Sequence, residues 1–254
     1  MIELDTIYNM DCLDGMRQIP DGSVDSVICD LPYGVLNEQS EGGSWDSIIP
    51  LEPLWTEYKR ICKPTAPIVL FAQGMFTAEL MMSNRKMWRY NLIWKKGNRP
   101  TGFLNANRMP LRIHEDICVF YDSLPTYNPQ KWKGEPVHRR ATRKINNRCY
   151  GKFQPSEWNN TDMKHPQSII DFDKEHVNGN FIHPTQKPVD LLRYLVLTYT
   201  NEGDTVLDNC MGSGTTAIAC IKEKRHFIGF ELNKEYFDKA CKRIKAEQAQ
   251  LTLW

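Results

Sequence analysis

The sequence lacks the signals that place a protein in a membrane, in an oxidising compartment or around a zinc ion. Its eight cysteines include no CxxC pair, and their spacing matches no zinc ligand set. A charged N-terminal segment followed by an apolar one, as in a signal peptide, is missing. The longest apolar run, Leu191–Tyr199, is interrupted by Arg193 and is too short to cross a bilayer. We therefore expect a soluble, cytoplasmic protein without a metal.

A net charge is also nearly absent, because the formal charge of the chain is +1. The charges are nevertheless unevenly distributed. Residues 85–164 hold 17 Lys and Arg against 6 Asp and Glu, whereas the remaining residues hold 15 against 25. Arginine slightly outnumbers lysine in this basic block, and aromatic residues lie among the charges: Trp88, Tyr90, Trp94, Phe103, Trp132, Tyr150, Phe153 and Trp158. Guanidinium groups bind phosphates and rings stack on bases, so the block predicts a nucleic-acid partner rather than a merely solvated surface.

Strands and helices are predicted to alternate along most of the chain. Apolar runs predict strands at 24–29, 68–71, 90–94, 117–121, 205–208 and 226–231. Helical spacing predicts helices at 51–62, 77–86, 188–199, 215–222 and 234–248. This alternation is typical of an α/β fold with a doubly wound, mostly parallel sheet. Residues 122–180, rich in Asn, Pro, Lys and Arg, predict an irregular, loop-rich insertion between two parts of one domain, 1–121 and 181–254.

A glycine-rich turn joins a predicted strand to a helix near the C-terminus. Gly212, Gly214 and Ala217 fit the pattern G-x-G-x-x-G/A, and Glu231 ends the next strand, where it can bind the hydroxyls of a ribose. The pattern alone suits NAD, S-adenosylmethionine or an ordinary structural turn. Asp208, just before the turn, favours a cationic sulfonium ligand, because its carboxylate would repel a pyrophosphate.

A second motif, Asp30-Leu31-Pro32-Tyr33, follows the first buried strand. The amino group of a nucleobase is a poor nucleophile, because its lone pair is delocalised into the ring. The Asp30 carboxylate and the Leu31 carbonyl can accept its two N–H bonds and localise that lone pair. Tyr33 offers a flat ring for an extruded base. Taken alone, the tetrapeptide also fits a simple strand-ending turn.

In this order, the two motifs resemble those of the β-class amino-group DNA methyltransferases, which methylate adenine N6 or cytosine N4. Further elements resemble the family in register: Asp11-Cys12, the box His183-Pro184-Thr185-Gln186-Lys187-Pro188, and Phe227–Leu232. The resemblance spans residues 5–121 and 181–247 and leaves 122–180 unaligned, as expected of a target-recognition region. Two departures are Leu31 in place of proline and Cys210 in place of phenylalanine.

The resemblance implies a Rossmann-like methyltransferase sheet with S-adenosyl-L-methionine as cofactor and double-stranded DNA as substrate. The implied catalytic residues are Asp30, Leu31, Pro32 and Tyr33. The implied cofactor-binding residues are Asp11, Cys12, Asp30, Thr185, Lys187, Asp208, Gly212, Gly214 and Glu231. Inside the insertion, we interpret the clustered cations as phosphate contacts: Arg139, Arg140, Arg143, Lys144 and Arg148.

Adenine N6 is the expected target, because Asp accompanies adenine at the first motif position more often in this family, whereas Ser accompanies cytosine N4. Cytosine N4 is the alternative. An NAD-dependent dehydrogenase or a non-enzymatic DNA-binding module would leave one of the two motifs unexplained. For His114-Glu115-Asp116 we expect a structural or DNA-facing role, since the cluster lacks metal-ligand spacing. The resemblance leaves open a homodimer, a cognate restriction enzyme, and a prokaryotic or phage origin.

Overall fold

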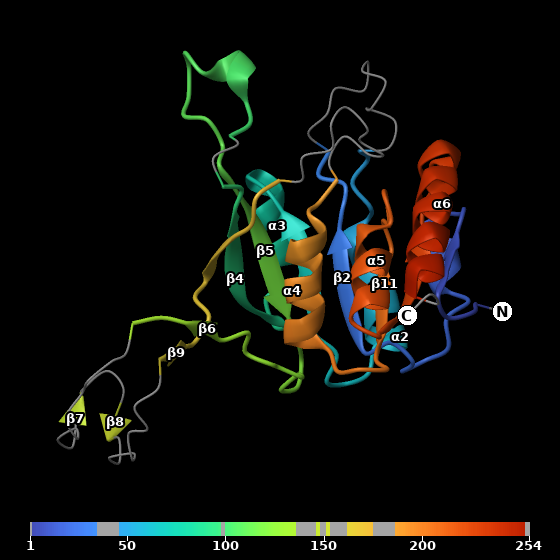
Figure 1. Ribbon diagram of the computed structural model, residues 1–254, viewed down its shortest axis with the longest axis horizontal. Coiled ribbons are helices and arrows are strands. Elements are labelled where there is room, and N and C mark those ends of the chain that lie inside the picture. The colour runs from blue at the N-terminus through green and yellow to red at the C-terminus, as the bar shows by residue number, and fades with distance from the viewer. Residues whose placement is uncertain are drawn as a thin grey trace. The chain divides into compact units, whose positions relative to one another are not determined.

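The computed structural model describes residues 2–34, 46–97, 100–135, 146–147, 151–152, 162–174 and 186–251. The chain divides into two compact units (Figure 1). The larger unit comprises Met1–Asn128 and Ser168–Trp254, and the smaller one comprises Pro129–Gln167. The smaller unit thus falls inside the segment 122–180 that the sequence predicts as an insertion.

The larger unit is built on an eight-stranded sheet in the order β1-β12-β11-β2-β3-β5-β4-β10. All neighbouring strands are parallel except β5, which runs antiparallel to both β3 and β4. The predicted α/β fold with a mostly parallel sheet is therefore confirmed. The strands are β1 Thr6–Tyr8, β2 Ser26–Asp30, β3 Ile68–Ala72, β4 Trp88–Lys95, β5 His114–Phe120, β10 Ile169–Asp171, β11 Thr205–Asp208 and β12 His226–Phe230.

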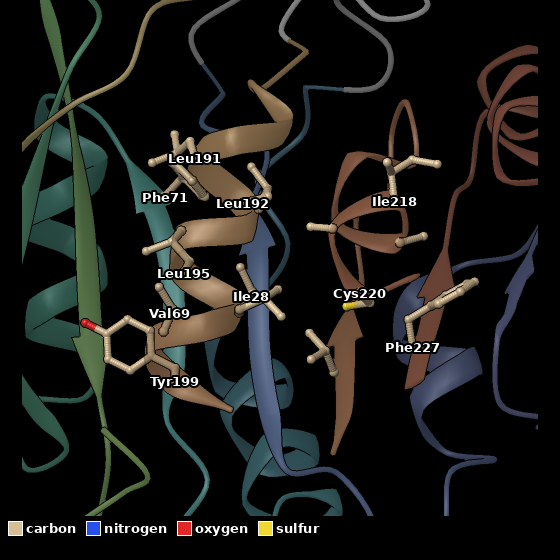
Figure 2. Close-up of a cluster of buried hydrophobic side chains, with 14 of the residues drawn as sticks. Ile28, Val69, Phe71, Leu191, Leu192, Leu195, Tyr199, Ile218, Cys220 and Phe227 are labelled. Carbon is tan, nitrogen blue, oxygen red and sulfur yellow. The ribbon is translucent and has the colours of Figure 1, made fainter. Parts of the chain in front are cut away.

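Helices cover both faces of this sheet. Side chains along a strand alternate between the faces, so Ile28 packs with Leu195 of one helical layer while Val27 packs with Leu54 of the other. Figure 2 shows the first of these two cores. One layer holds α1 Cys12–Met16, α2 Leu51–Ile61 and α3 Met75–Ser83; the other holds α4 Val189–Tyr199, α5 Thr215–Lys222 and α6 Lys234–Leu251. None of the described helices has the length and hydropathy of a membrane-spanning segment.

The described residues of the smaller unit form two short antiparallel pairs. β6 Trp132–Lys133 pairs with β9 Met163–Lys164, and β7 Asn146–Asn147 pairs with β8 Gly151–Lys152. The five cations predicted to contact DNA, namely Arg139, Arg140, Arg143, Lys144 and Arg148, lie outside the described residues. Their role therefore stays a prediction.

The structure corrects the predicted insertion at its C-terminal end. Ile169–Asp171 form β10, which pairs in parallel with β4 and belongs to the main sheet. A strand of three residues is too short to show a periodic pattern in the sequence. Trp94 of β4, one of the aromatic residues of the basic block, is only 1% exposed, and its indole nitrogen donates to the Phe172 carbonyl oxygen at 2.9 Å. Trp94 is therefore a core residue that lines the cavity described below, and its ring is not displayed on the molecular surface.

A short first helix was also absent from the sequence prediction. The Asp11 carboxylate caps α1 by accepting from the amides of Leu13 at 2.8 Å and Asp14 at 3.2 Å. The helix packs closely on β12, because a Cβ atom on Gly15 would lie 2.2 Å from the Phe230 ring. Glycine at this position therefore allows the helix and the buried ring to approach each other.

We expect Gly15→Ala to lower the free energy of unfolding by about 1–3 kcal/mol, because the added methyl group overpacks the fully buried Phe230. Urea titration followed by circular dichroism measures the change. Asp14→Ala, at the exposed neighbouring position of the same helix, is the matched control. Equal midpoints for the two variants would contradict this account of the packing.

Candidate active site

A cavity of about 750 Å³ opens at the carboxyl ends of β2, β11 and β12 in the larger unit. Asp30, Asp208 and Glu231 line it, and each lies at or directly after the end of its strand. The carboxyl edge of a parallel sheet is where ligands bind in doubly wound folds. The fold thus brings together two motifs that are separated by about 180 residues in the sequence.

The Asp30 tetrapeptide is held in a defined conformation. The Tyr33 hydroxyl donates to Oδ1 of Asp30 at 2.7 Å. The amides of Tyr33 and Gly34 both donate to Oδ1 of Asp46, at 2.8 and 3.1 Å. Leu31 is buried, and the Tyr33 ring packs on Phe76 with centroids 5.4 Å apart. The turn is therefore fixed by Asp46 and by packing, although leucine replaces the more rigid proline.

Glu231 joins the glycine turn to the strand beside it. Its Oε2 accepts from the Gly212 amide at 2.8 Å, and its Oε1 accepts from the Asn233 amide at 2.7 Å. Both Gly212 and Gly214 have positive φ angles, 54° and 79°, a conformation that favours glycine. Each carboxylate oxygen keeps a second lone pair for a ligand in the cavity. Burial raises the pKa of Glu231, against the opposing effect of the two amides.

Asp208 is the most enclosed of these three carboxylates. Its Oδ1 accepts from the Cys210 amide at 3.1 Å, and its Oδ2 accepts from the Thr216 hydroxyl at 2.5 Å. Burial raises its pKa to about 6, although the Thr216 hydroxyl and the Cys210 amide oppose this shift. A cation in the cavity would offset the cost of burying the ionised carboxylate.

The other residues predicted to bind a cofactor are placed as follows. Asp11 and Cys12 line the same cavity, and the Asp11 carboxylate also caps α1. Thr185 lies outside the described residues. Lys187 lines the cavity, where its ammonium group contacts the Asp30 carboxylate.

Comparison with known proteins agrees with this arrangement of motifs. Residues 24–242 match the family of N6/N4 DNA methylases. The chain belongs to this family. The curated relatives include the type II methyltransferase M1.MboII of Moraxella bovis, which is 27% identical over 264 residues, covering 94% of this chain and 96% of the relative.

Solved structures show the same fold. A complex of M1.HpyAVI with SAM aligns with a TM-score of 0.61 and 24% identity, covering 94% of this chain and 98% of that one. The cytosine-N4-specific PvuII DNA methyltransferase aligns with a TM-score of 0.69 and 13% identity, covering 99% and 93% of the two chains.

The methylase carries a largely buried group of four charged side chains, of which Asp30 is one. Lys187 donates to Oδ2 of Asp30 and lies 3.3 Å from Oε2 of Glu115. The other oxygen of Glu115 pairs with Lys96. The side chains of Lys96 and Lys187 are only 3% and 9% exposed, and all four residues line the cavity. Two cations and two carboxylates together leave this group without a net charge.

The pKa values reflect competition between burial and these neighbours. Burial raises the pKa of Asp30, Lys187 lowers it, and the negative charge of Glu115 raises it further. Burial also disfavours the ionised form of Glu115, but attraction to Lys187 and Lys96 prevails and lowers the pKa of that carboxyl group. Glu115 therefore stays ionised and acts on Asp30 in two ways, directly through its charge and by sharing Lys187.

Neither Glu115 nor Lys96 was assigned to the site from the sequence. Glu115 occurs in the cluster for which we expected a structural or DNA-facing role, and it instead faces the cavity. The feature that indicates a site role for Glu115 is its position near the start of β5. A strand that runs antiparallel to β3 begins at the edge of the sheet where β3 ends, which is the edge where the cavity opens. The position and direction of β5 in the sheet are known only from the structure, so this feature could not be used at the level of the sequence.

We expect Glu115→Gln to shift the acidic limb of the pH–rate profile of methyl transfer downward by about one unit and to slow the reaction. The variant removes a negative charge that raises the pKa of Asp30, so Asp30 ionises at lower pH and becomes a weaker hydrogen-bond acceptor. Both the shift of the acidic limb and the lower rate are measured by single-turnover methylation of unmethylated plasmid DNA between pH 5 and 9.

The double variant Glu115→Gln/Lys96→Met is the control, because it removes one charge of each sign from the group. Its acidic limb should move back toward the wild-type position. Identical pH profiles for wild type and Glu115→Gln would show that Glu115 is structural only.

Proposed function

We propose that this methylase transfers a methyl group from S-adenosylmethionine to N6 of adenine in double-stranded DNA. The chain is a DNA amino-methyltransferase that uses S-adenosylmethionine. The adenine target and the roles of individual residues are the proposal. One observation carries it: a single cavity is lined by Asp30 of the catalytic tetrapeptide and by Asp208 and Glu231 of the glycine motif.

The cavity fits the proposed cofactor in charge. S-adenosylmethionine carries a sulfonium and an ammonium group, and the buried Asp208 carboxylate offers them a negative partner. Glu231 keeps lone pairs toward the cavity for the ribose hydroxyls. Asp11 and Cys12 lie at the same side and are assigned to the adenine ring of the cofactor. A pyrophosphate would be repelled by Asp208, which disfavours a dinucleotide.

The bound cofactor supplies a methyl group activated by its positive sulfur. The residues of this chain prepare the acceptor amine. The Asp30 carboxylate accepts one N–H bond and the Leu31 carbonyl oxygen the other, which moves electron density onto the nitrogen. Lys187 and the Tyr33 hydroxyl hold the carboxylate from two sides, one on each oxygen. The amine would take the methyl group directly, without a covalent enzyme intermediate: the sulfur would keep the electron pair of the broken C–S bond, and the amine would give up one proton to the Asp30 carboxylate or to water.

Cytosine N4 is the second candidate, since the PvuII enzyme of the same fold is cytosine-N4-specific. Both bases present the same N–C=N unit to Asp30, so the carboxylate does not distinguish them. The preference for adenine is supported by aspartate at the first position of Asp30-Leu31-Pro32-Tyr33, where the resemblance associates aspartate with adenine and serine with cytosine.

We assign DNA backbone binding to the basic block, with Arg139, Arg140, Arg143, Lys144 and Arg148 as phosphate contacts. We propose that the enzyme is encoded by a prokaryote or a phage and acts in the cytoplasm, which is supported by the origin of the type II methyltransferase M1.MboII in the bacterium Moraxella bovis. A second copy of the chain and a cognate restriction enzyme are the protein partners that we propose.

Nucleoside mass spectrometry of DNA from an expression host tests the proposed target. We expect N6-methyladenine above the background of a methylation-deficient host, and none from Asp30→Ala, because losing the charged acceptor raises the barrier by at least about 3 kcal/mol. Titration of the variant with S-adenosylhomocysteine checks that its cofactor site is intact. N4-methylcytosine without N6-methyladenine would overturn the adenine assignment and leave the role of Asp30 standing.

Glu231→Ala should weaken S-adenosylhomocysteine binding about tenfold or more, because it removes an acceptor pair for the ribose and releases the Gly212 amide. Titration calorimetry measures the affinity. Glu235→Ala is the matched control, since Glu235 is exposed on the next helix, where it forms an ion pair with Lys239. Equal affinities for wild type and Glu231→Ala would refute this assignment.

A further inference from the structure

The connection between β4 and β5 forms a projecting finger, which we define as residues 100–113 (Figure 1). Its base is closed by two backbone hydrogen bonds between Thr101 and Arg112, at 2.8 and 3.0 Å. Gly102, with a φ angle of 92°, turns the chain into the 3-10 helix η1, Phe103–Asn105. The amides of Arg108 and Met109 both donate to the Asn105 carbonyl oxygen, at 2.8 and 3.0 Å. These bonds give the finger a defined shape.

The finger rises from the edge of the sheet where the active site opens. β4 runs parallel to β3 and β2, because both β3 and β4 are antiparallel to β5. The end of β4 therefore lies at the same edge as Asp30, the last residue of β2. Thr101 lines the cavity, and the Arg112 guanidinium donates to Oε1 of Gln73, another cavity residue, at 2.9 Å. The base of the finger is thus attached to the mouth of the site.

The tip exposes large apolar side chains to solvent. Leu104 is fully exposed, Phe103 is 67% exposed and Met109 is 49% exposed. Single exposed apolar residues are common, but three within seven positions of one projection are typical of a binding surface. The finger contains two arginines, Arg108 and Arg112, and no Asp or Glu, so the charged side chains near the apolar tip in the sequence are positive.

This combination fits the distorted DNA that the proposed reaction requires. Asp30 lies inside a cavity, and a base that remains stacked in a duplex cannot reach it. Extruding the base leaves a gap between two apolar base faces, next to phosphates. Several DNA-binding proteins insert apolar side chains between base steps, and a gap left by an extruded base offers the same kind of apolar surface.

We propose that the finger is a DNA wedge, in which Phe103 and Leu104 enter the duplex and occupy the space left by the extruded target base. Arg108 and Arg112 then lie where they can bind the flanking phosphates. This inference rests on the proposed DNA methylation and adds the element that keeps the base outside the stack. Contact with a second copy of the chain would also bury these apolar residues. Such a contact, however, would not explain why the charged residues of the finger are all positive.

The test compares wild type with Phe103→Ala/Leu104→Ala on synthetic duplexes that carry the recognition sequence, identified by sequencing plasmid DNA from the expression host. On a fully paired duplex, kcat/KM should fall about tenfold or more, because the gap loses its apolar filling. On a duplex with an abasic site opposite the target base, the variant should come within about threefold of wild type, since less pairing energy opposes extrusion. Met82→Ala, at a 62% exposed apolar residue of α3, is the matched control.

Fluorescence of 2-aminopurine at the target position gives a readout without chemistry, and its rise on protein binding should be much smaller for the double variant. Equal loss of kcat/KM on both duplexes would overturn the wedge, and so would wild-type kinetics on the paired duplex. If light scattering shows that Phe103→Ala/Leu104→Ala converts a dimer into a monomer, the finger is a subunit contact instead.

The test also separates the wedge from the proposed function. If wild type methylates no DNA, the proposed function fails. If wild type is active and the variant is unaffected, only the wedge is rejected. The comparison between the paired and the abasic duplex is valid whether the target base is adenine or cytosine.

Discussion

Most of the active site depends on one buried ion pair, in which Lys187 holds the carboxylate of Asp30 at the end of β2. A lone carboxylate in this position would be costly to bury and would tend to take up a proton. The lysine offsets that cost, and Glu115 and Lys96 balance the lysine in turn. The result is a hydrogen-bond acceptor held by a lysine in a largely enclosed cavity, where its hydrogen bonds are stronger than in water. Four residues from four different segments are needed to achieve it.

The sheet order explains how the two halves of the site come to share one cavity. β11, which carries Asp208 near the end of the chain, pairs directly with β2, which carries Asp30 near its beginning. β12 follows on the other side of β11 and brings Glu231. Because all three strands are parallel, their functional carboxylates emerge at one edge. Glu231 has two functions there, since it holds the glycine turn through Gly212 while it faces the cavity.

The basic block of the sequence divides into structural parts with different functions. Some of its members are buried: Trp94 lies in the core, and Lys96 is paired with Glu115 in the wall of the active-site cavity. Others belong to the exposed finger between β4 and β5, and the cations at 139–148 belong to the smaller unit. A charge count is therefore a useful indicator of a nucleic-acid partner, but it does not tell which cations face that partner. Burial and strand position make this distinction.

The sequence by itself determined the fold class, the family and the positions of both motifs. Each of these is encoded locally: apolar runs specify strands, Gly212 and Gly214 specify a tight turn, and Asp30-Leu31-Pro32-Tyr33 is contiguous. Strand β10 escaped prediction because three residues are too few for a period, and α1 because its five-residue helix depends on capping by Asp11 and on packing against Phe230. Only the tertiary structure decided that Glu115 and Lys96 surround Lys187, that Lys187 contacts Asp30, and that Trp94 lies in the core. These contacts join residues far apart in the chain, and their distances are set by strand order and burial, which no local pattern encodes.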